Sequence, residues 1–472
     1  MEITDKRHPL AARVFRRIQR IVDDRGLQAF VIGGFVRDYY LRRPSNDIDV
    51  VVIGSGIEAA EALGREVHTK VSVFKTFGTA MLRCDGWEIE FVGARKESYS
   101  RDSRKPVVEA GTIEDDQRRR DFTINALAWS LNDATFGELV DPFDGMGDME
   151  RLIIRTPCDP DVTFDDDPLR MLRAVRFASQ LGFDIYPDTF DAIQRNAHRI
   201  EIVSKERIIT EINKIVLSPR PSIGFELLEM TGLLKLVFPE LDALKGVERR
   251  GSHAHKDNFR HTLQVLDNVA QRSDDLWLRW AALLHDIAKP ATKAYDPKIG
   301  WTFHGHEVLG SKMVPSIFRA MKLPLNDRMK FVQKMVFLHL RPIVLSEDLV
   351  TDSAVRRLLF EAGDDVESRR TLSEADIISG LESTVKRYMQ NFELVRRKMA
   401  DIEEKDRVRN FQPPISGELI MSTYGIPPCR EIGDIKAIIK DAILDGQIPN
   451  EYEAAYALME QLAAERGLKK VE

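Results

Sequence analysis

The sequence contains few cysteines and no apolar run of membrane length. Its three cysteines, Cys84, Cys158 and Cys429, lie far apart and do not have the spacing of metal ligands. The sequence therefore predicts no structural disulfide and a cytoplasmic location. No apolar run approaches the roughly 20 residues of a membrane helix, and the N-terminal residues are too polar for a signal peptide. We expect no membrane partner.

The chain also has no overall excess of positive charge. Its formal net charge is −6, which does not by itself indicate binding to nucleic acid. An acidic protein can nevertheless carry a locally basic face. Two arginine clusters could form one, namely the consecutive run 118–120 and the three arginines that recur every third residue from 170 to 176.

A chain of 472 residues is long enough for three or four domains. Its first part mixes short strand-like runs with helical patterns, and the pattern becomes mostly helical from about residue 145. This predicts an α+β fold. Proline and glycine clusters and shifts in pattern place domains at 1–144, 145–245, 246–395 and 396–472. The apolar spacing near the start predicts a helix over residues 1 to about 30.

A pair of aspartates follows a glycine pair between two apolar runs. Gly33 and Gly34 end the first run, and Asp47 and Asp49 lead into the second, 50–53. Residues two apart on a strand point the same way, so both carboxylates face one site. Two such carboxylates can hold two divalent cations, which can clamp the oxygens of a phosphoryl transfer. Paired glycines let backbone amides approach phosphates. The alternative is a surface loop with two solvated aspartates, but the flanking runs favour the site.

The segments GGFVRD (33–38) and DIDVV (47–51) resemble the signature of nucleotidyltransferases of the polymerase β superfamily. They are most similar to class II tRNA nucleotidyltransferases (CCA-adding enzymes) and bacterial poly(A) polymerases. The resemblance implies a head domain with a mixed sheet, followed by helical neck, HD and tail domains. It implies Mg²⁺, tRNA, CTP and ATP, and it places Arg37 at the nucleotide. It also favours Glu90 as a third catalytic carboxylate over its neighbour Glu88.

The segment RRRDFTINALAWS, from residue 118, resembles the RRDFTINA motif of this family. Asp121 and Asn125 are four residues apart and would share a helix face, from which they could contact a ribose. Arg120 could pair with the triphosphate. A structural interpretation is a capped amphipathic helix with Asp121 as its N-cap, and the two interpretations are compatible.

The segment DDDPLRMLRAVRFA, from residue 165, resembles the EDxxR element that reads the incoming base. The resemblance assigns base reading to Asp167 and Arg170, and phosphate or nucleotide contact to Arg173 and Arg176. A carboxylate can accept from the exocyclic amine of C or A, and a guanidinium can donate to the adjacent ring acceptor. A purely structural helix could use the same residues in salt bridges.

Two further segments bear on this site. SKERIITEINKI, from residue 204, predicts a supporting helix in which Arg207 and Glu211 pair at i,i+4. The polar, basic segment 99–111 is long enough to be the flexible loop of CCA-adding members, which enzymes that stop after CC lack.

A second constellation has the order H…HD…H…H…D, which is similar to that of HD domains. Imidazole and carboxylate ligands suit transition metals such as Mn, Ni, Co or Fe, and such a metal can deliver hydroxide to a phosphate. Lys289 could hold that phosphate. A lone histidine is usually a core residue, but six filled positions favour a metal site. They are His261, His285, Asp286, His306, His339 and Asp376.

These features together predict template-independent addition of CCA to tRNA, with a possible phosphohydrolase acting on phosphoesters such as 2′,3′-cyclic phosphates. The sequence leaves open A-adding, CC-adding and poly(A)-polymerase activities. An alternative from another class is an HD phosphohydrolase with an N-terminal RNA-binding module. The oligomeric state is also left open.

Overall fold

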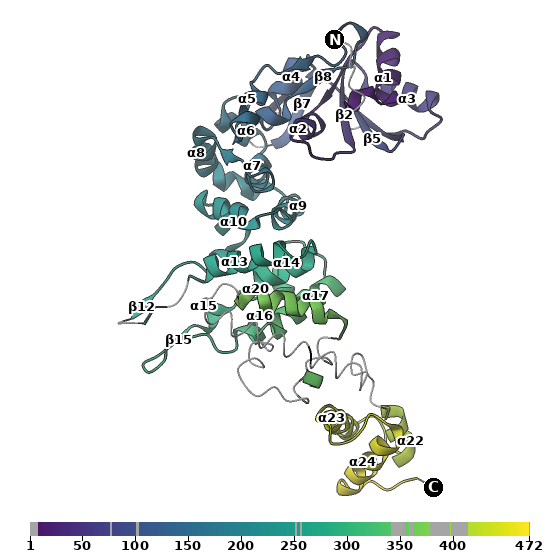
Figure 1. The fold of residues 1–472 in the computed structure, drawn as a ribbon, viewed down its shortest axis with the longest axis vertical. Helices are drawn as coiled ribbons and strands as arrows, with labels where there is room; N and C mark the ends of the chain where they lie inside the picture. The colour runs from purple at the N-terminus through teal and green to yellow at the C-terminus, as the bar shows by residue number, and fades with distance from the viewer. Residues whose placement is uncertain are drawn as a thin grey trace. The chain divides into compact units, whose positions relative to one another are not determined.

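The computed structural model describes residues 8–75, 78–100, 103–250, 253–254, 257–340, 363–377 and 414–471, together with a few residues in 353–360 and residue 397. They form two compact units, 1–242 and 243–472 (Figure 1). The first unit begins with a mixed sheet and the remainder is mostly helical, which confirms the predicted α+β class. None of the helices among the described residues has both the length and the apolar character needed to cross a membrane.

A seven-stranded sheet forms the N-terminal part of the first unit. Strands β2 and β5 pair in parallel, and every other pair in this sheet is antiparallel. The parallel register sets Asp49 opposite Glu90 and Asp47 opposite Glu88. The strand order is β3 (Ser72–Phe74), β4 (Thr79–Cys84), β5 (Trp87–Gly93), β2 (Asp47–Ile53), β1 (Gln28–Ile32), β8 (Ala128–Ser130) and β9 (Leu139–Val140).

Three helices accompany the sheet: α1 (Arg13–Asp23), α2 (Gly34–Tyr40) and α3 (Gly56–Glu66). The apolar positions of α1, including Val14 and Ile18, are buried. The helix predicted to reach residue 30 instead ends at Asp23, because Gly26 turns the chain at a φ of 61° and β1 begins at Gln28. The segment expected to be a loop forms an antiparallel hairpin of β6 (Arg95–Ser100) and β7 (Ser103–Ala110).

Helices complete the first unit. Here α7 (Leu169–Leu181) packs against α9 (Lys205–Val216) and α10 (Pro221–Met230), and most apolar residues of α7 are buried. A short parallel pair, β10 (Ile153–Ile154) with β11 (Asp184–Ile185), interrupts the helical region. The helices are α4 (Ile113–Arg118), α5 (Gly145–Glu150), α6 (Pro160–Asp166), α7 (Leu169–Leu181), α8 (Pro187–Asn196), α9 (Lys205–Val216), α10 (Pro221–Met230), α11 (Leu234–Val237) and α12 (Pro239–Asp242).

The second unit is also mainly helical. Its central helix α14 (Leu276–Leu284) is almost entirely buried and packs against α13 (Asn258–Ala270) and α17 (Asp327–Leu338). The other helices are α13 (Asn258–Ala270), α15 (Lys289–Thr292), α16 (His306–Ala320), α17 (Asp327–Leu338), α20 (Val366–Ile377), α22 (Gly417–Tyr424), α23 (Arg430–Leu444) and α24 (Tyr452–Glu465). The unit also contains two short antiparallel strand pairs. They are β12 (Arg249–Arg250) with β13 (His253–Ala254), and β14 (Ala294–Asp296) with β15 (Gly300–Thr302).

Candidate functional site

Three predicted carboxylates lie on adjacent strands of the sheet. Asp47 and Asp49 are on β2, and Glu90 is directly opposite Asp49 on β5. Burial raises the pKa of Asp49, and the carboxylates of Glu90 and Asp47 raise it further, although Arg120 opposes them. This concentration of negative charge suits a hard divalent cation such as Mg²⁺, which binds through oxygen ligands. The competing Glu88 instead forms an ion pair with Arg83 at 2.7 Å, which supports the choice of Glu90.

Gly33 leaves room for Arg120 beside these carboxylates. The backbone of Gly33 has a φ of 85°, which glycine adopts far more readily than other residues. A Cβ atom at this position would lie only 2.9 Å from Nη1 of Arg120 and 3.6 Å from Oδ2 of Asp49. Gly34, the first residue of α2, lies beside Arg37, whose Nη2 would be 3.6 Å from an added Cβ. Side-chain-free backbone therefore borders the carboxylates.

A fully buried acid that the sequence analysis missed holds Arg120 in place. Asp116 contacts both Arg119 and Arg120, and its Oδ2 lies 3.2 Å from Nη2 of Arg120. The signal was present in the sequence, because Asp116 on α4 precedes these arginines by three and four residues, which is helical contact spacing.

Asp121 contacts Arg173 directly and is linked to Arg37 through Asn125. Its Oδ2 accepts hydrogen bonds from Nε and lies close to Nη2 of Arg173, each at 2.6 Å. Its Oδ1 accepts from Nδ2 of Asn125 at 3.0 Å, and Oδ1 of Asn125 accepts from Nη1 of Arg37 at 2.6 Å. Burial by itself would raise the pKa of Asp121, but Arg173 and the hydrogen bond from Asn125 outweigh it and lower the pKa to about 2.

The local structure around Asp121 differs from the predicted amphipathic helix. Thr123–Asn125 form a single 3₁₀ turn, and the chain then enters β8. Asp121 accepts a hydrogen bond from the amide of Phe122 rather than capping a helix. The prediction was wrong because Phe122, Ile124, Leu127 and Trp129 are all buried, so the apolar pattern came from burial on several sides.

The two residues expected to read the base lie near the start of α7. Asp167 lies between α6 and α7. It therefore does not share a helix face with the arginines of α7, although the three-residue spacing had suggested that it would. Its Oδ1 accepts from the amide of Leu169 at 3.2 Å, and its Oδ2 accepts from Nη2 of Arg207 at 3.1 Å. Arg170 donates through Nη2 to the carbonyl of Arg119 at 2.6 Å.

Arg176, which the resemblance placed at the phosphate or nucleotide, has a buried acid as its partner. Its side chain is buried, lies over the Phe177 ring, and forms an ion pair with Glu211 at 3.1 Å. Burial lowers the pKa of Arg176 to about 10. The predicted i,i+4 pairing within α9 was therefore wrong in its partners, because Arg207 and Glu211 each pair with a residue at or near α7 instead.

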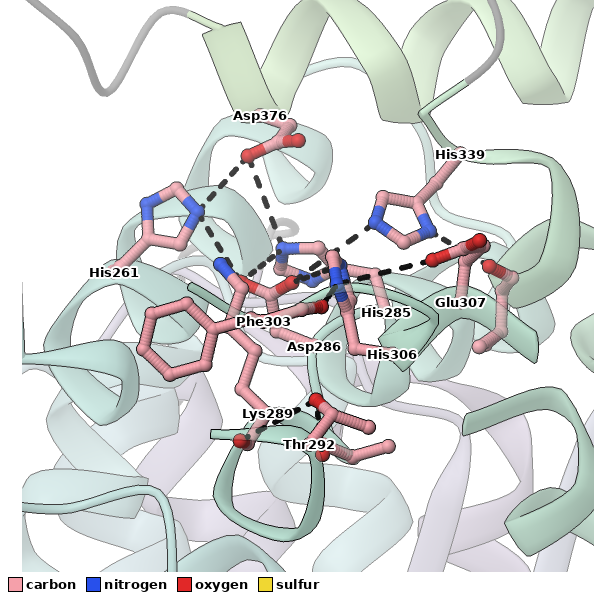
Figure 2. A network of polar contacts seen from close by, with 12 residues as sticks. His261, His285, Asp286, Lys289, Thr292, Phe303, His306, Glu307, His339 and Asp376 are labelled. Carbon is pink, nitrogen blue, oxygen red and sulfur yellow. Dashed lines mark hydrogen bonds and ion pairs between the residues drawn. The ribbon is translucent and has the colours of Figure 1, made fainter. Parts of the chain in front are cut away.

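The second predicted constellation comes together in the second unit (Figure 2). Asp286 lies at its centre, with Lys289 reaching to within 2.6 Å of its Oδ2. Five elements supply the six residues: His261 lies on α13, His285 and Asp286 follow α14, His306 begins α16, His339 follows α17, and Asp376 lies on α20. The sequence order H…HD…H…H…D thus corresponds to one cluster.

Three of these imidazoles are held with one nitrogen directed inward. Nδ1 of His285, His306 and His339 lies 2.7 Å from the carbonyl oxygen three residues earlier in each case. Since a carbonyl only accepts, each Nδ1 carries a proton, which leaves each Nε2 as the nitrogen available to a metal. Among the described residues these three buried Nε2 atoms have no hydrogen-bond partner. This is the arrangement that metal-ligating histidines show.

The charge state of the cluster also suits a metal. Burial, and then the positive charge of His285, lower the pKa of His339 to about 4, so its imidazole is neutral near pH 7. Burial alone would raise the pKa of Asp376, but the hydrogen bond from His261 and the charge of His285 lower it to about 2. Burial alone would lower the pKa of His285, but the carboxylate of Asp286 raises it, so a metal would take the place of a proton on this imidazole. The donor set therefore consists of imidazole and carboxylate, which are ligands of Mn, Fe, Co or Ni.

Three known families match successive parts of the chain. Residues 29–155 match the poly A polymerase head domain, residues 182–245 match the family described as a probable RNA and SrmB-binding site of polymerase A, and residues 258–381 match the HD domain. An A-adding tRNA nucleotidyltransferase of Deinococcus radiodurans is 33% identical over 352 residues, which cover 72% of this chain and 78% of the relative. The chain belongs to the class II CCA-adding enzyme and poly(A) polymerase family. It is therefore an enzyme of the tRNA nucleotidyltransferase class.

Other relatives agree on the class of reaction. A multifunctional CCA protein of Shewanella frigidimarina is 34% identical over 306 residues, which cover 63% of this chain and 70% of the relative. The solved structure of the Bacillus stearothermophilus CCA-adding enzyme in complex with CTP matches with a TM-score of 0.67 and 25% identity, covering 97% of this chain and 99% of that one. The solved structure of a tRNA nucleotidyltransferase complexed with a primer tRNA and an incoming ATP analog matches with a TM-score of 0.57 and 25% identity. The match covers 80% of this chain and 98% of that one.

Proposed function

We propose that this nucleotidyltransferase adds CCA to the 3′ ends of tRNA from CTP and ATP without a template. The observation that carries the proposal is the trio of carboxylates on β2 and β5, beside Arg120 and the backbone of Gly33. The multifunctional CCA relatives and the solved structures with CTP or with primer tRNA support the choice of substrates.

The roles of the residues follow from their positions. Asp47, Asp49 and Glu90 would hold Mg²⁺, which when bound neutralises the triphosphate and favours ionisation of the 3′ hydroxyl. Gly33 and Gly34 let the triphosphate approach the backbone. Arg120, which Asp116 holds beside this backbone, would pair with the triphosphate.

The base would be read by Asp167 and Arg170. Arg170 uses one N–H on the carbonyl of Arg119 and another on the carbonyl of Thr163, and a guanidinium has five, so donors remain for a ring nitrogen or carbonyl. We assign Arg173 to the support of Asp121 and Arg176 to the buried support of α7, on the basis of their ion pairs. Asp121, Asn125 and Arg37 would set the position of the ribose or phosphate side of the nucleotide.

The test is to incubate the full chain with a tRNA that lacks CCA, with CTP, ATP or both, and to sequence the 3′ ends. CCA with both nucleotides is the expected product. Asp49→Asn should abolish addition, whereas the exposed Asp85→Asn should not. Addition of A only to a tRNA that already ends in CC would assign the chain to the A-adding activity of the Deinococcus radiodurans relative. Termination at CC or long A tails would point to the other sister activities.

A second candidate activity is phosphoester hydrolysis in the HD domain, on substrates such as 2′,3′-cyclic phosphates. The three inward-facing Nε2 atoms favour it, because they have no hydrogen-bond partner among the described residues and a transition metal would use them. A bound metal of this kind supplies an activated water at neutral pH. Asp286 and Lys289 would respectively hold the metal and orient the phosphate.

An RNA oligonucleotide ending in a 2′,3′-cyclic phosphate tests this activity. With Mn²⁺ or Ni²⁺ present, the full chain should open the ring, and His285→Ala should not. His304→Ala is the matched control, because His304 is exposed and lies two residues from His306. No opening with any of the metals would refute the hydrolase, and it would leave nucleotidyl transfer untouched.

A further inference from the structure

The ring of Phe177 lies among three guanidiniums that come from two parts of the first unit. Arg37 belongs to α2 beside the sheet, whereas Arg173, Arg176 and Phe177 itself belong to α7. The guanidinium carbons of Arg37, Arg173 and Arg176 lie 5.0, 5.5 and 3.9 Å from the centre of the ring. All three distances are within the roughly 6 Å over which an aromatic ring attracts a cation. Phe177 is only 5% exposed, so little water screens this attraction.

The guanidiniums repel one another, and the ring reduces the cost of bringing them together. Burial lowers the pKa of Arg176, and the positive charges of Arg173 and Arg37 lower it further. Glu211 offsets only part of this effect. The face of an aromatic ring carries partial negative charge, which leucine and methionine lack. A buried aliphatic side chain in place of Phe177 would therefore fill the space without attracting the guanidiniums.

One face of α7 follows the segment 119–122 of the chain. Positions 170, 173 and 177 are separated by three and four residues, so they share that face. Each contacts a later residue of the segment in turn: Arg170 the carbonyl of Arg119, Arg173 the carboxylate of Asp121, and Phe177 the ring of Phe122. The rings of Phe122 and Phe177 meet edge to face, with their centres 5.9 Å apart. Phe177 thus makes the last contact of this row, about two helical turns from Arg170.

We propose that Phe177 is a positioning residue for nucleotide selection. Its ring ties α7 to Arg37 and Phe122 beside the sheet, and so fixes the distance between the base-reading pair, Asp167 and Arg170, and the groups that hold the triphosphate. This inference rests on the proposed function and adds to it a residue that acts only through its neighbours. Because the triphosphate is held beside the sheet while the base is read from α7, a shift of about 1 Å between the two can lower the rate roughly 100-fold.

A residue that only fills the core would respond differently to substitution. Loss of packing lowers the fraction of folded enzyme, which reduces the rate with every nucleotide by the same factor. Loss of position lowers the rate with the correct nucleotide more than the rate with a wrong one, because only the correct base pairs with the reading residues. The ratio of the two kcat/KM values does not depend on the folded fraction, and it therefore separates the two roles.

The test measures kcat/KM of the full chain for CTP and UTP on a tRNA that lacks CCA, and for ATP and GTP on a tRNA that ends in CC. Phe177→Leu and Phe177→Met, which remove the ring, should each lower the ratio of correct to wrong nucleotide by about tenfold or more. Phe177→Tyr keeps the aromatic face and should stay within about twofold of the wild-type ratio. Phe183→Leu is the matched control, because Phe183 is also 5% exposed but lies beyond the end of α7 and outside the row of contacts.

The outcomes separate the role of Phe177 from the proposed function. An unchanged ratio in both ring-free variants of Phe177, with a wild type that selects its nucleotides, would overturn the role of Phe177 and leave the proposed function intact. An equal fall in Phe183→Leu or in Phe177→Tyr would also overturn it, because selection would then follow packing rather than the aromatic face. A wild type that adds no nucleotide to either tRNA would refute the proposed function itself, and the role of Phe177 with it.

Discussion

Replacement of Asp121 by asparagine should destabilise the first unit by a predictable amount. Asp121 is 7% exposed and its pKa is lowered to about 2 from the model-compound value of 3.8. Each pKa unit corresponds to about 1.4 kcal/mol, so its ionised form should contribute about 2.5 kcal/mol to the free energy of unfolding near neutral pH. Asp121→Asn keeps the shape of the side chain but loses the charge that Arg173 neutralises.

The pH dependence gives this prediction its sign. Because the folded pKa of Asp121 lies below the unfolded one, the stabilisation is complete above the unfolded value and is lost as the pH falls through the folded value. The difference between wild type and Asp121→Asn should therefore be full at neutral pH and should shrink as the pH falls from 3.8 toward about 2. Above the unfolded value the difference should not depend on pH.

Urea unfolding read by hydrogen exchange of peptides from β1 and β8 would assign the transition to the first unit. Glu226→Gln is the matched control, because it also neutralises a carboxylate but lies exposed on α10, and it should change little. In a double-mutant cycle, Asp121→Asn and Arg173→Gln should show strong coupling. Equal stability of wild type and Asp121→Asn at neutral pH, or a loss no larger than that of the control, would refute the reasoning.

Three further predictions concern the first unit. Gly33→Ala should lower the initial rate of CTP incorporation tenfold or more, because its Cβ would displace Arg120. Gly26→Ala is the control for the cost of a positive φ alone, because nothing lies within 4 Å of its Cβ. Glu90→Gln should reduce that rate by about 100-fold and Glu88→Gln should not, and equal effects would remove the third carboxylate from the proposal. Glu211→Gln should leave the buried Arg176 without its ion pair and lower the free energy of unfolding of the unit by about 3 kcal/mol. A urea midpoint equal to that of the wild type would contradict this.

The placement of the carboxylates was predictable because strands have a fixed period. Asp47 and Asp49 precede an apolar run, so a strand puts them on one side, and the structure has them on β2. The choice between Glu88 and Glu90 was not predictable from that period, since residues two apart on a strand point to the same face of the sheet. What distinguishes them is the neighbouring strand, because β4 brings Arg83 opposite Glu88 and the two form an ion pair.

The cluster in the HD domain shows the same limit. The order of histidines and aspartates in the sequence predicted which residues would meet, and all six do. It contained no information on which oxygen of Asp286 each would face. That division arises because α16 and α17 bring His306 and His339 to one oxygen, while α13 brings His261 to the other. Only the packing of these helices determines which oxygen each histidine faces.

The arginines of α7 show why the family motif alone cannot assign roles to residues. Equal spacing in the sequence suggested one functional stripe, yet Arg170, Arg173 and Arg176 have three different kinds of partner: a backbone carbonyl, Asp121 and Glu211. Two of these three guanidiniums are therefore committed to acids within the protein. Arg207 on α9 likewise contacts Asp167. Because α9 supplies partners both to Asp167, which is proposed to read the base, and to the buried Arg176, it contacts both ends of the proposed base-reading element. The proposed addition without a nucleic-acid template would require a rigid protein element of this kind, since the protein itself would hold the hydrogen-bonding pattern that a template base would otherwise present.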